Sequence, residues 1–247
     1  MSRWKAAAIH VSISALIGLI SATLIFFVWY PHPYSQAAGA DQLVLLLLGV
    51  DVVLGPLLTL IVFRAGKWGM RFDLTVIAIA QACAFFYGTS VVVRARPAFI
   101  VANVDRFSLV TANDIEPADY AKAKRVEFAS APWTGPRIIG AQLPTDVHER
   151  NNLAFSGPGG KDIDVMPQYY VDYTTVARDL LQRAKPIDEL VRAHPDARLP
   201  IDAWLRKRGY TATGIRWVPL TARRATLTML LDANTGIALD ALPITPW

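Results

Sequence analysis

The stretch LVLLLLGVDVVLGPLLTLIVF at residues 43–63 decides the fold class of this chain. It contains one charged residue, Asp51, and one other polar residue, Thr59. At a rise of about 1.5 Å per residue, a helix of this length spans the roughly 30 Å hydrocarbon core of a bilayer. Its length and composition therefore predict a transmembrane helix over residues 43–63.

Two further apolar runs of similar length flank this stretch, at residues 6–29 and 74–93. The first has no charged residue, and the second is apolar apart from Gln81 and a few small hydroxyl residues. Only 18% of the chain is charged, against about 25% in ordinary soluble domains. The apolar excess lies before residue 94, so we expect a three-helix transmembrane region at 1–93 and a globular domain at 94–247.

The first apolar run must be distinguished from a signal peptide. Arg3 and Lys5 give it a basic start, and Ala38-Gly39-Ala40 is typical of a cleavage site. However, the run is longer than the roughly 7–15 residues of a signal-peptide core, and it ends about ten residues before that site. We therefore expect this run to be retained as a helix.

Positive charge is distributed unevenly between the short loops. Arg3 and Lys5 precede the first run, whereas the loop at 30–42 has neither Lys nor Arg. The loop after the second run contains Arg64, Lys67 and Arg71. Because Lys and Arg favour the cytoplasmic side, we expect a cytoplasmic N-terminus and place residues after 93 across the membrane. Arg94 and Arg96 oppose this orientation weakly.

Asp51 is the most informative residue of the membrane region because it lies near the middle of its span. A carboxylate at this depth costs at least about 2.5 kcal/mol. Gly55 and Pro56 follow shortly after and loosen the helix, which frees a backbone carbonyl. Three interpretations stay open. The carboxyl group contacts a guest helix or a neighbour in the bundle, forms a hydrogen bond within its own bundle with Gln81, or belongs to a proton or ion relay.

Residues after 93 alternate between strand and helix patterns, with turn signals between them. β-rich segments predict strands at 98–104, 107–111, 137–143, 215–220, 225–231 and 237–242. Amphipathic or proline-initiated segments predict helices at 117–125, 174–184, 186–193 and 200–208. We expect a mobile loop at 151–164 and a hairpin turn at 232–236. The pattern predicts an α+β domain with a mainly antiparallel sheet.

Motifs of catalysis and metal binding are missing from the sequence. The single cysteine, Cys83, excludes an intrachain disulfide, and His148 and His194 lack metal-ligand spacing. The glycines at 157–160 lack the strand and helix that flank a phosphate-binding loop. Basic residues are dispersed apart from 206–208, which end a predicted helix, so we expect no nucleic-acid partner. We also expect no enzyme activity, no cofactor and no metal.

Three motifs in the membrane region occur in a fixed order: FFVWYP at 26–31, LGVDVVLGPLLT at 48–59 and RFDL at 71–74. Shorter motifs follow in the next domain: ARP at 95–97, VDRF at 104–107 and TGPR at 134–137. Taken together, these motifs resemble the type IV pilin accessory protein family. The resemblance extends from the first helix to about residue 143 and is weaker in the rest of the chain.

The resemblance implies a Gram-negative inner-membrane protein with a periplasmic domain and no active site. Such proteins act in a chaperone-like way on a cognate type IV pilin. Before assembly, a pilin is an apolar membrane-spanning helix that carries a periplasmic head. The main alternative is a membrane-anchored periplasmic sensor or assembly scaffold unrelated to pili. A transporter or membrane enzyme built around Asp51 is a third class, although transporters usually show more spans and repeats.

Six residues are candidates for partner binding or for a structural role. They are Asp51, Gly55, Pro56, Asp105, Arg106 and Arg137. The membrane carboxylate would supply the polar contact to a pilin helix, while the glycine and proline would shape its own helix. The three candidates of the second domain would orient that domain or touch the pilin, and their alternative role is a structural turn with a salt bridge. The expected partners are a pilin and the lipid bilayer.

Overall fold

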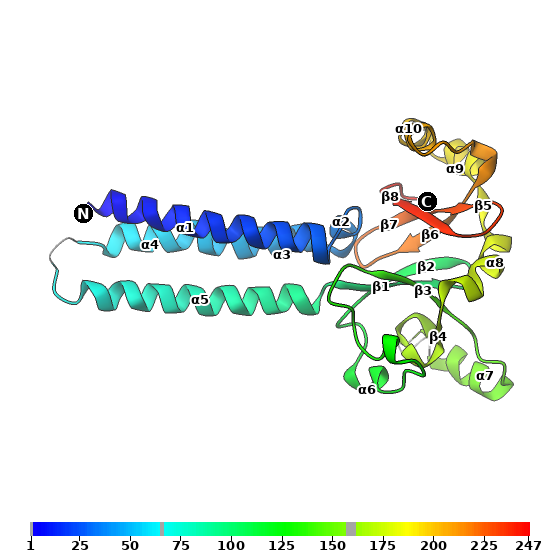
Figure 1. Cartoon of the computed structure of the whole chain (residues 1–247), viewed down its shortest axis with the longest axis horizontal. Coiled ribbons are helices and arrows are strands. Elements are labelled where there is room, and N and C mark those ends of the chain that lie inside the picture. Colours follow the sequence, from blue (N-terminus) through cyan, green and yellow to red (C-terminus); the bar gives the residue numbers. More distant parts are fainter. Residues whose placement is uncertain (1, 65–66, 157–161) are drawn as a thin grey trace. The chain divides into compact units, whose positions relative to one another are not determined.

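The computed structural model describes residues 2–64, 67–156 and 162–247 (Figure 1). Backbone contacts divide the chain into two compact units. The first, called the helical unit, comprises Met1–Ser35 and Gly39–Ala95, and the second, called the C-terminal unit, comprises Gln36–Ala38 and Arg96–Trp247. The short segment 36–38 belongs to the second unit, in which the main-chain N–H of Arg224 donates to the carbonyl oxygen of Ala37 at 3.1 Å.

Three apolar spans form the helical unit. The first consists of α1 (Arg3–Leu24) and the π-helical η1 (Ile25–Trp29), and the short α2 (Tyr34–Ala38) follows it. The middle span joins α3 (Ala40–Gly49), the π-helical η2 (Val50–Leu54) and α4 (Gly55–Val62), and the last span is α5 (Met70–Arg94). By length and composition, each span suffices to cross a membrane. The three long apolar helices expected from the sequence are therefore confirmed, and each begins a few residues earlier than predicted.

The outer spans make their main contacts with the middle span. α1 packs against α4 (Figure 1) and against η2, while α5 packs against α3 and α4. Glycine allows close approach, because a Cβ on Gly88 of α5 would lie 2.5 Å from Cδ1 of Leu47. Between α1 and α4, Nδ1 of His10 lies 2.7 Å from Oγ1 of Thr59. Most side chains of the spans face outward, which suits helices surrounded by lipid.

A mixed sheet organises the C-terminal unit. Its strands are β1 (Pro97–Asn103), β2 (Arg106–Thr111), β3 (Arg137–Ala141), β4 (Tyr170–Val171), β5 (Lys185–Pro186), β6 (Ile215–Thr221), β7 (Thr226–Asp232) and β8 (Ala238–Leu242). Their spatial order is β4-β3-β1-β2-β6-β7-β8, with β5 paired to β6. Within the described residues, β1–β3 and β2–β6 pair in parallel and the other pairings are antiparallel. The predicted α+β fold with a mainly antiparallel sheet is confirmed.

The sheet contributes to two separate apolar cores. The first core includes residues of β1 and β3, and the rings of Phe99 and Phe128 both meet Tyr170 edge to face in it. The second core includes residues of β6 and β7 and centres on Ile215 and Trp217. Between the two halves, β2 and β6 share two registered residue pairs. This junction is narrow for a sheet of this size.

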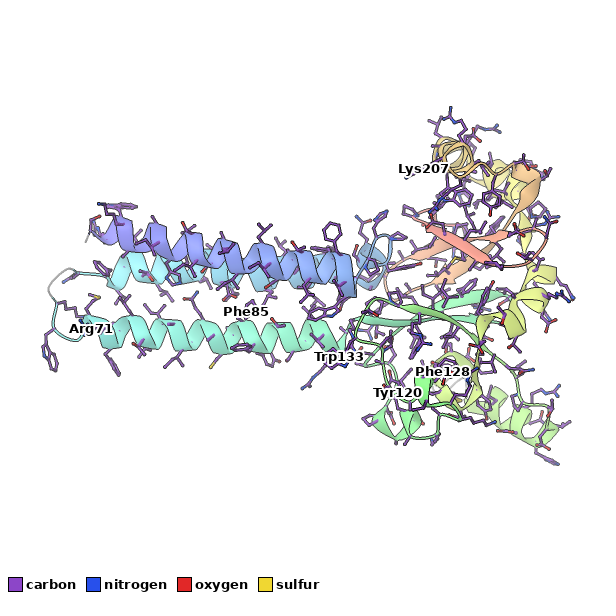
Figure 2. All side chains as sticks on the ribbon, in the orientation of Figure 1. Arg71, Phe85, Tyr120, Phe128, Trp133 and Lys207 are labelled. Atoms are coloured by element: carbon purple, nitrogen blue, oxygen red, sulfur yellow. The ribbon has the colours of Figure 1, made fainter. Side chains whose placement is uncertain are left out.

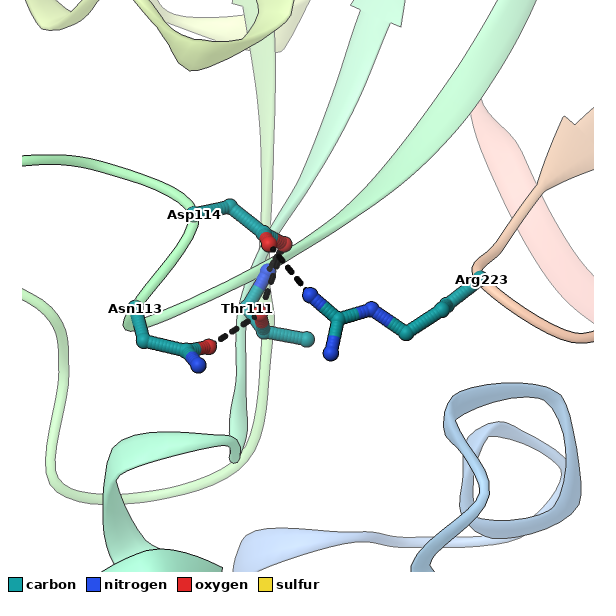
Figure 3. Close-up of polar contacts among 4 residues, drawn as sticks. All are labelled: Thr111, Asn113, Asp114 and Arg223. Carbon is teal, nitrogen blue, oxygen red and sulfur yellow. Dashed lines mark hydrogen bonds and ion pairs between the residues drawn. The ribbon is translucent and has the colours of Figure 1, made fainter.

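A polar cluster reinforces the narrow junction (Figure 3). Arg223, in the turn after β6, pairs through Nη2 with Oδ1 of Asp114 at 3.1 Å. The other oxygen of Asp114 accepts from the main-chain N–H of Thr111 at 2.7 Å, and the Thr111 hydroxyl lies 2.6 Å from the same oxygen. Oδ1 of Asn113 lies 2.7 Å from that hydroxyl. The cluster therefore ties the turn after β2 to the turn after β6.

Helices and short 3-10 turns connect the strands. The helices are α6 (Pro117–Tyr120), α7 (Val147–Ser156), α8 (Tyr173–Arg183), α9 (Ile187–Ala193) and α10 (Arg198–Arg208). The 3-10 turns are η3 (Val126–Phe128), η5 (Ile163–Val165), η6 (Pro167–Tyr169), η7 (Pro195–Ala197) and η8 (Ala212–Gly214). The last three α-helices agree with the sequence prediction to within a few residues.

The helix predicted at 117–125 is too long. α6 ends at Tyr120, and the chain then turns so that η3 buries Phe128 in the first core. The segment after Tyr120 lacks apolar residues at helical spacing. Burial of one large aromatic ring therefore outweighs the helix propensity of this segment.

The mobile loop predicted at 151–164 is wrong over 151–156, which belong to α7, and over 163–164, which belong to η5. A side-chain cap explains the helix, because Oδ1 of Asp146 accepts a hydrogen bond from the main-chain N–H of Glu149 at 2.8 Å. The glycines at 157–160 lie outside the described residues.

Gly236 provides a test of how the β7–β8 turn packs. Its φ is +73°, and a Cβ there would lie 2.5 Å from the carbonyl oxygen of Ala177 in α8. Gly209 has the same φ but open space around it. We expect Gly236→Ala to lower the free energy of unfolding by about 3 kcal/mol, and Gly209→Ala by about 1 kcal/mol, because the second change adds backbone strain alone. Urea unfolding followed by circular dichroism measures both, and equal losses would contradict the close approach.

Candidate functional site

Asp51 lies in η2, the π-helical part of the middle span. The residue is 9% exposed, and its Oδ1 has no hydrogen-bond partner among the described residues. Most buried polar atoms in proteins are paired, so each exception needs a physical explanation. The Asp51 carboxyl group is available for a hydrogen bond that the rest of the helical unit does not supply.

The local sequence explains why the helix widens at Asp51. Pro56 has no main-chain N–H, so it cannot donate to the carbonyl of Val52 four residues earlier or, in the π-helical pattern, to that of Asp51 five residues earlier. The π-helical segment ends at Leu54, and α4 begins with Gly55 and Pro56 in its first turn. π-Helical turns are rare and occur frequently at functional sites. Gly55 and Pro56 thus lie where the span changes its geometry, one turn after the carboxyl group.

Gln81 on α5 reaches this widened turn. Its Nε2 donates a hydrogen bond to the main-chain carbonyl oxygen of Asp51 at 3.3 Å. Gly55 makes room for the contact, since a Cβ at that position would lie 1.8 Å from the same nitrogen. Gln81 therefore satisfies a backbone carbonyl of the middle span, whereas one of the three sequence interpretations paired it with the carboxyl group of Asp51.

An open groove of about 330 Å³ lies between α1 and α5, beside Asp51. It is lined by His10, Ile13, Ser14 and Ile17 of α1, by Asp51, and by Ala78, Gln81, Ala82, Phe85 and Phe86 of α5. Phe85, one of the lining residues, is marked on α5 in Figure 2. The lining is mainly apolar, with a few polar groups beside the widened turn. In hydrocarbon, such a groove suits an apolar helix that brings one hydrogen-bonding group.

The three candidates of the C-terminal unit do not form one site. Asp105 and Arg106 lie at the β1–β2 turn. Nε of Arg106 lies 2.9 Å from Oδ1 of Asp105, and each of the two side chains is about half exposed. Arg137 lies in register with Phe99, and its Nη1 donates to the carbonyl oxygen of Glu127 at 3.2 Å. The strand β1 separates the two places by about 13 Å. Exposed pairs of this kind contribute about 1 kcal/mol or less to stability.

Two buried titratable groups of the C-terminal unit have raised pKa values. Burial raises the pKa of Tyr120 to about 12, although the nearby Arg96 lowers it in part. Burial also raises the pKa of Asp164 above its ordinary value. Across the part of the chain that the structure describes, no group of three or more His, Cys, Asp or Glu side chains could hold a metal ion.

Sequence reasoning missed two side-chain amides in this unit. Oδ1 of Asn103 and Oε1 of Gln168 are buried, and neither has a hydrogen-bond partner among the described residues. No spacing or composition signal marks them, because an amide becomes exceptional only when the fold buries it unpaired.

Gly55→Ala tests whether Gln81 repairs the backbone of the middle span. The new Cβ would displace Nε2 of Gln81 and break its bond to the Asp51 carbonyl. Gly49→Ala is the matched control, since nothing lies within 4 Å of its Cβ and both changes gain the same helix propensity. We expect Gly55→Ala alone to lower the free energy of unfolding, by about 0.6–2 kcal/mol, as measured by thermal unfolding in detergent. A loss of the same size for Gly49→Ala would contradict this role of Gln81.

Comparisons with known proteins agree on one family. Residues 1–39 match the family model described as "Fimbrial assembly protein FimB". The serogroup I fimbrial assembly protein of Dichelobacter nodosus is 29% identical, over 97% of this chain and 96% of its own length. The serogroup C1 and C2 protein is 37% identical over 113 residues, which cover 45% of this chain and 86% of the relative. No solved structure matches. The chain therefore belongs to the fimbrial assembly protein family, the type IV pilus assembly family that its motifs resemble.

Proposed function

We propose that this protein is an inner-membrane, chaperone-like accessory protein that binds and stabilises a cognate type IV pilin before or during pilus assembly. Its family supports a role in pilus assembly. The finer proposal is supported by the groove between α1 and α5, beside which Oδ1 of Asp51 has no partner in the described part of the chain. A pilin that has not yet been assembled carries an apolar membrane helix, and a groove of this kind suits such a helix.

The pilin helix would become a fourth member of the helical unit. It would pack against exposed apolar walls, since Ile17 is 45% exposed and Phe86 is 70% exposed. Asp51 would add one hydrogen bond at the widened turn. Contacts between helices in a membrane contribute about 0.6–2 kcal/mol each, so a short interface binds reversibly. Reversible binding suits a protein that must release the pilin to the growing pilus.

The proposed location follows from the distribution of positive charge. Arg3 and Lys5 precede the first span, and the loop between the second and third spans is also basic. These charges favour a cytoplasmic N-terminus. With three crossings, the C-terminal unit would lie in the periplasm, on the side of the pilin head. In this proposal the protein acts by binding alone, without catalysis or a cofactor.

Photo-crosslinking in membranes tests the groove. Ala82 lines the groove, whereas Ala80 is also exposed on α5 but faces about 200° away around the helix axis. With a photoreactive residue at position 82 and the cognate pilin present, we expect an adduct within the apolar helix of the pilin, identified by mass spectrometry. Position 80 should give little or none. Adducts of position 82 confined to this chain would contradict the proposal, and adducts to a different membrane complex would favour a scaffold unrelated to pili.

Substitutions of Asp51 test the polar contact separately. Asp51→Leu keeps an apolar side chain of similar size but removes the hydrogen bond, so we expect about three- to tenfold less pilin to copurify. Asp51→Asn keeps an acceptor and should retain most of the binding. The proton or ion relay would be favoured instead if Asp51→Asn abolished a pH- or ion-dependent activity while pilin binding stayed normal.

A further inference from the structure

Two neighbouring cavities of about 290 and 260 Å³ lie in the C-terminal unit. Both are lined by Gln142 and Leu143, which directly follow β3. The first lies at the carboxyl ends of the parallel strands β1 and β3, beside α8, and the second lies next to β4. We call the residues that line these two neighbouring cavities the β3 track.

Each cavity of the β3 track contains a side-chain amide with an unpaired buried oxygen. Asn103, the last residue of β1, is 8% exposed, and its Oδ1 has no partner within the described residues. Oε1 of Gln168, in the second cavity, is buried and unpaired in the same sense. Two such atoms on one surface are unusual, because native proteins pair nearly all buried polar atoms. A ligand that carries hydrogen-bond donors along its length would satisfy both oxygens once the atoms that cover them move aside.

The rim of the first cavity is strained. Val104 has a φ of +31°, and it is the one non-glycine residue with positive φ in the described chain. A β-branched side chain rarely adopts this conformation, and strain of this kind clusters at functional sites. The Val104 side chain is 45% exposed, and that of Leu143 is 42% exposed. The β3 track therefore presents two large apolar side chains next to its unpaired amides.

The charges along the β3 track are balanced. Asp179 and Arg183 lie one turn apart on α8 and line the first cavity. Neither has an ion pair within the part of the chain that the structure describes. Lys124 and Glu149 line the second cavity, where Glu149 accepts a hydrogen bond from the hydroxyl of Tyr169 at 2.8 Å. A ligand with little net charge suits this surface better than a strongly acidic or basic one.

We propose that the β3 track binds an extended, weakly charged peptide segment from the periplasmic head of the pilin, an inference that rests on the function proposed above. An extended chain advances about 3.3 Å per residue and presents main-chain N–H and C=O groups along both sides. The amides of Asn103 and Gln168 pair with these groups, and its side chains contact Val104 and Leu143. A compact small molecule would fill one cavity and leave the other amide unpaired.

Photo-crosslinking at Leu143, which both cavities share, tests the proposal. Leu199 is 78% exposed on α10, lines neither cavity and serves as the matched control. In membranes that contain the full chain and the cognate pilin, we expect position 143 to give an adduct within the pilin head. Position 199 should give none. The absence of an adduct at position 143, or adducts only to a second copy of this chain, overturns the inference.

A parallel probe at Ala82 separates this inference from the function on which it rests. An adduct from Ala82 to the pilin helix without one from Leu143 keeps the proposed function and overturns peptide binding at the β3 track. An adduct from Leu143 alone supports the β3 track and overturns the groove as the pilin site. The absence of adducts at both positions overturns both proposals.

Two substitutions test the residues of the β3 track. Asn103→Leu removes an amide whose oxygen has no partner among the described residues, so we expect unchanged thermal stability and an adduct yield at Leu143 lower by about tenfold. Val104→Gly relieves the strained φ and removes one apolar contact, so it should raise stability and also lower the yield. It keeps the test valid if Asn103→Leu fails to fold. An unchanged yield in a folded variant of either kind overturns the inference.

Discussion

A chain in hydrocarbon must satisfy its main-chain polar groups within the protein, and this constraint governs the middle span. Pro56 withholds one N–H donor, the helix widens in η2, and the side chain of Gln81 bonds the carbonyl oxygen of Asp51. The absence of a side chain at Gly55 gives Gln81 its position. Because Gln81 bonds the backbone, Oδ1 of Asp51 is left without a partner among the residues that the structure describes. The segment 51–56 thus accounts both for the hydrogen bond from Gln81 to the backbone and for the unpaired Oδ1 of Asp51 beside the groove.

In the C-terminal unit, the parallel pairing of β1 and β3 decides which residues lie together. Because β1 and β3 run in the same direction, their carboxyl ends meet at one edge of the sheet, next to α8. Asn103 and Gln142 come to one surface in this way, although they are far apart in the chain. An antiparallel pairing of β1 and β3 would place these residues at opposite edges. Strand direction therefore decides whether the β3 track exists, more than any property of its individual side chains.

The spans and the β7–β8 hairpin could be predicted because their signals are local: an uninterrupted apolar run in one case and turn residues in the other. The parallel pairs could not, since they join residues such as Phe107 and Leu220, whose contact leaves no local pattern. Asp51 could be identified from its depth in the span, but its lack of a partner depends on which face of α5 carries Gln81. Likewise, the distance between Arg137 and the β1–β2 turn follows from the register of β1 and β3.

The hydrogen bond between the N–H of Arg224 and the carbonyl of Ala37 also constrains the order of events during synthesis. Ala37 follows the first span, whereas Arg224 lies in the turn between β6 and β7. About 190 residues separate the two, which corresponds to about 10 to 40 s of translation at typical rates. Until then the carbonyl of Ala37 must be hydrated or find another donor. The link after the first span therefore waits for about 190 further residues before it reaches its final partner, and a ribosome stalled before Arg224 would leave it unfinished.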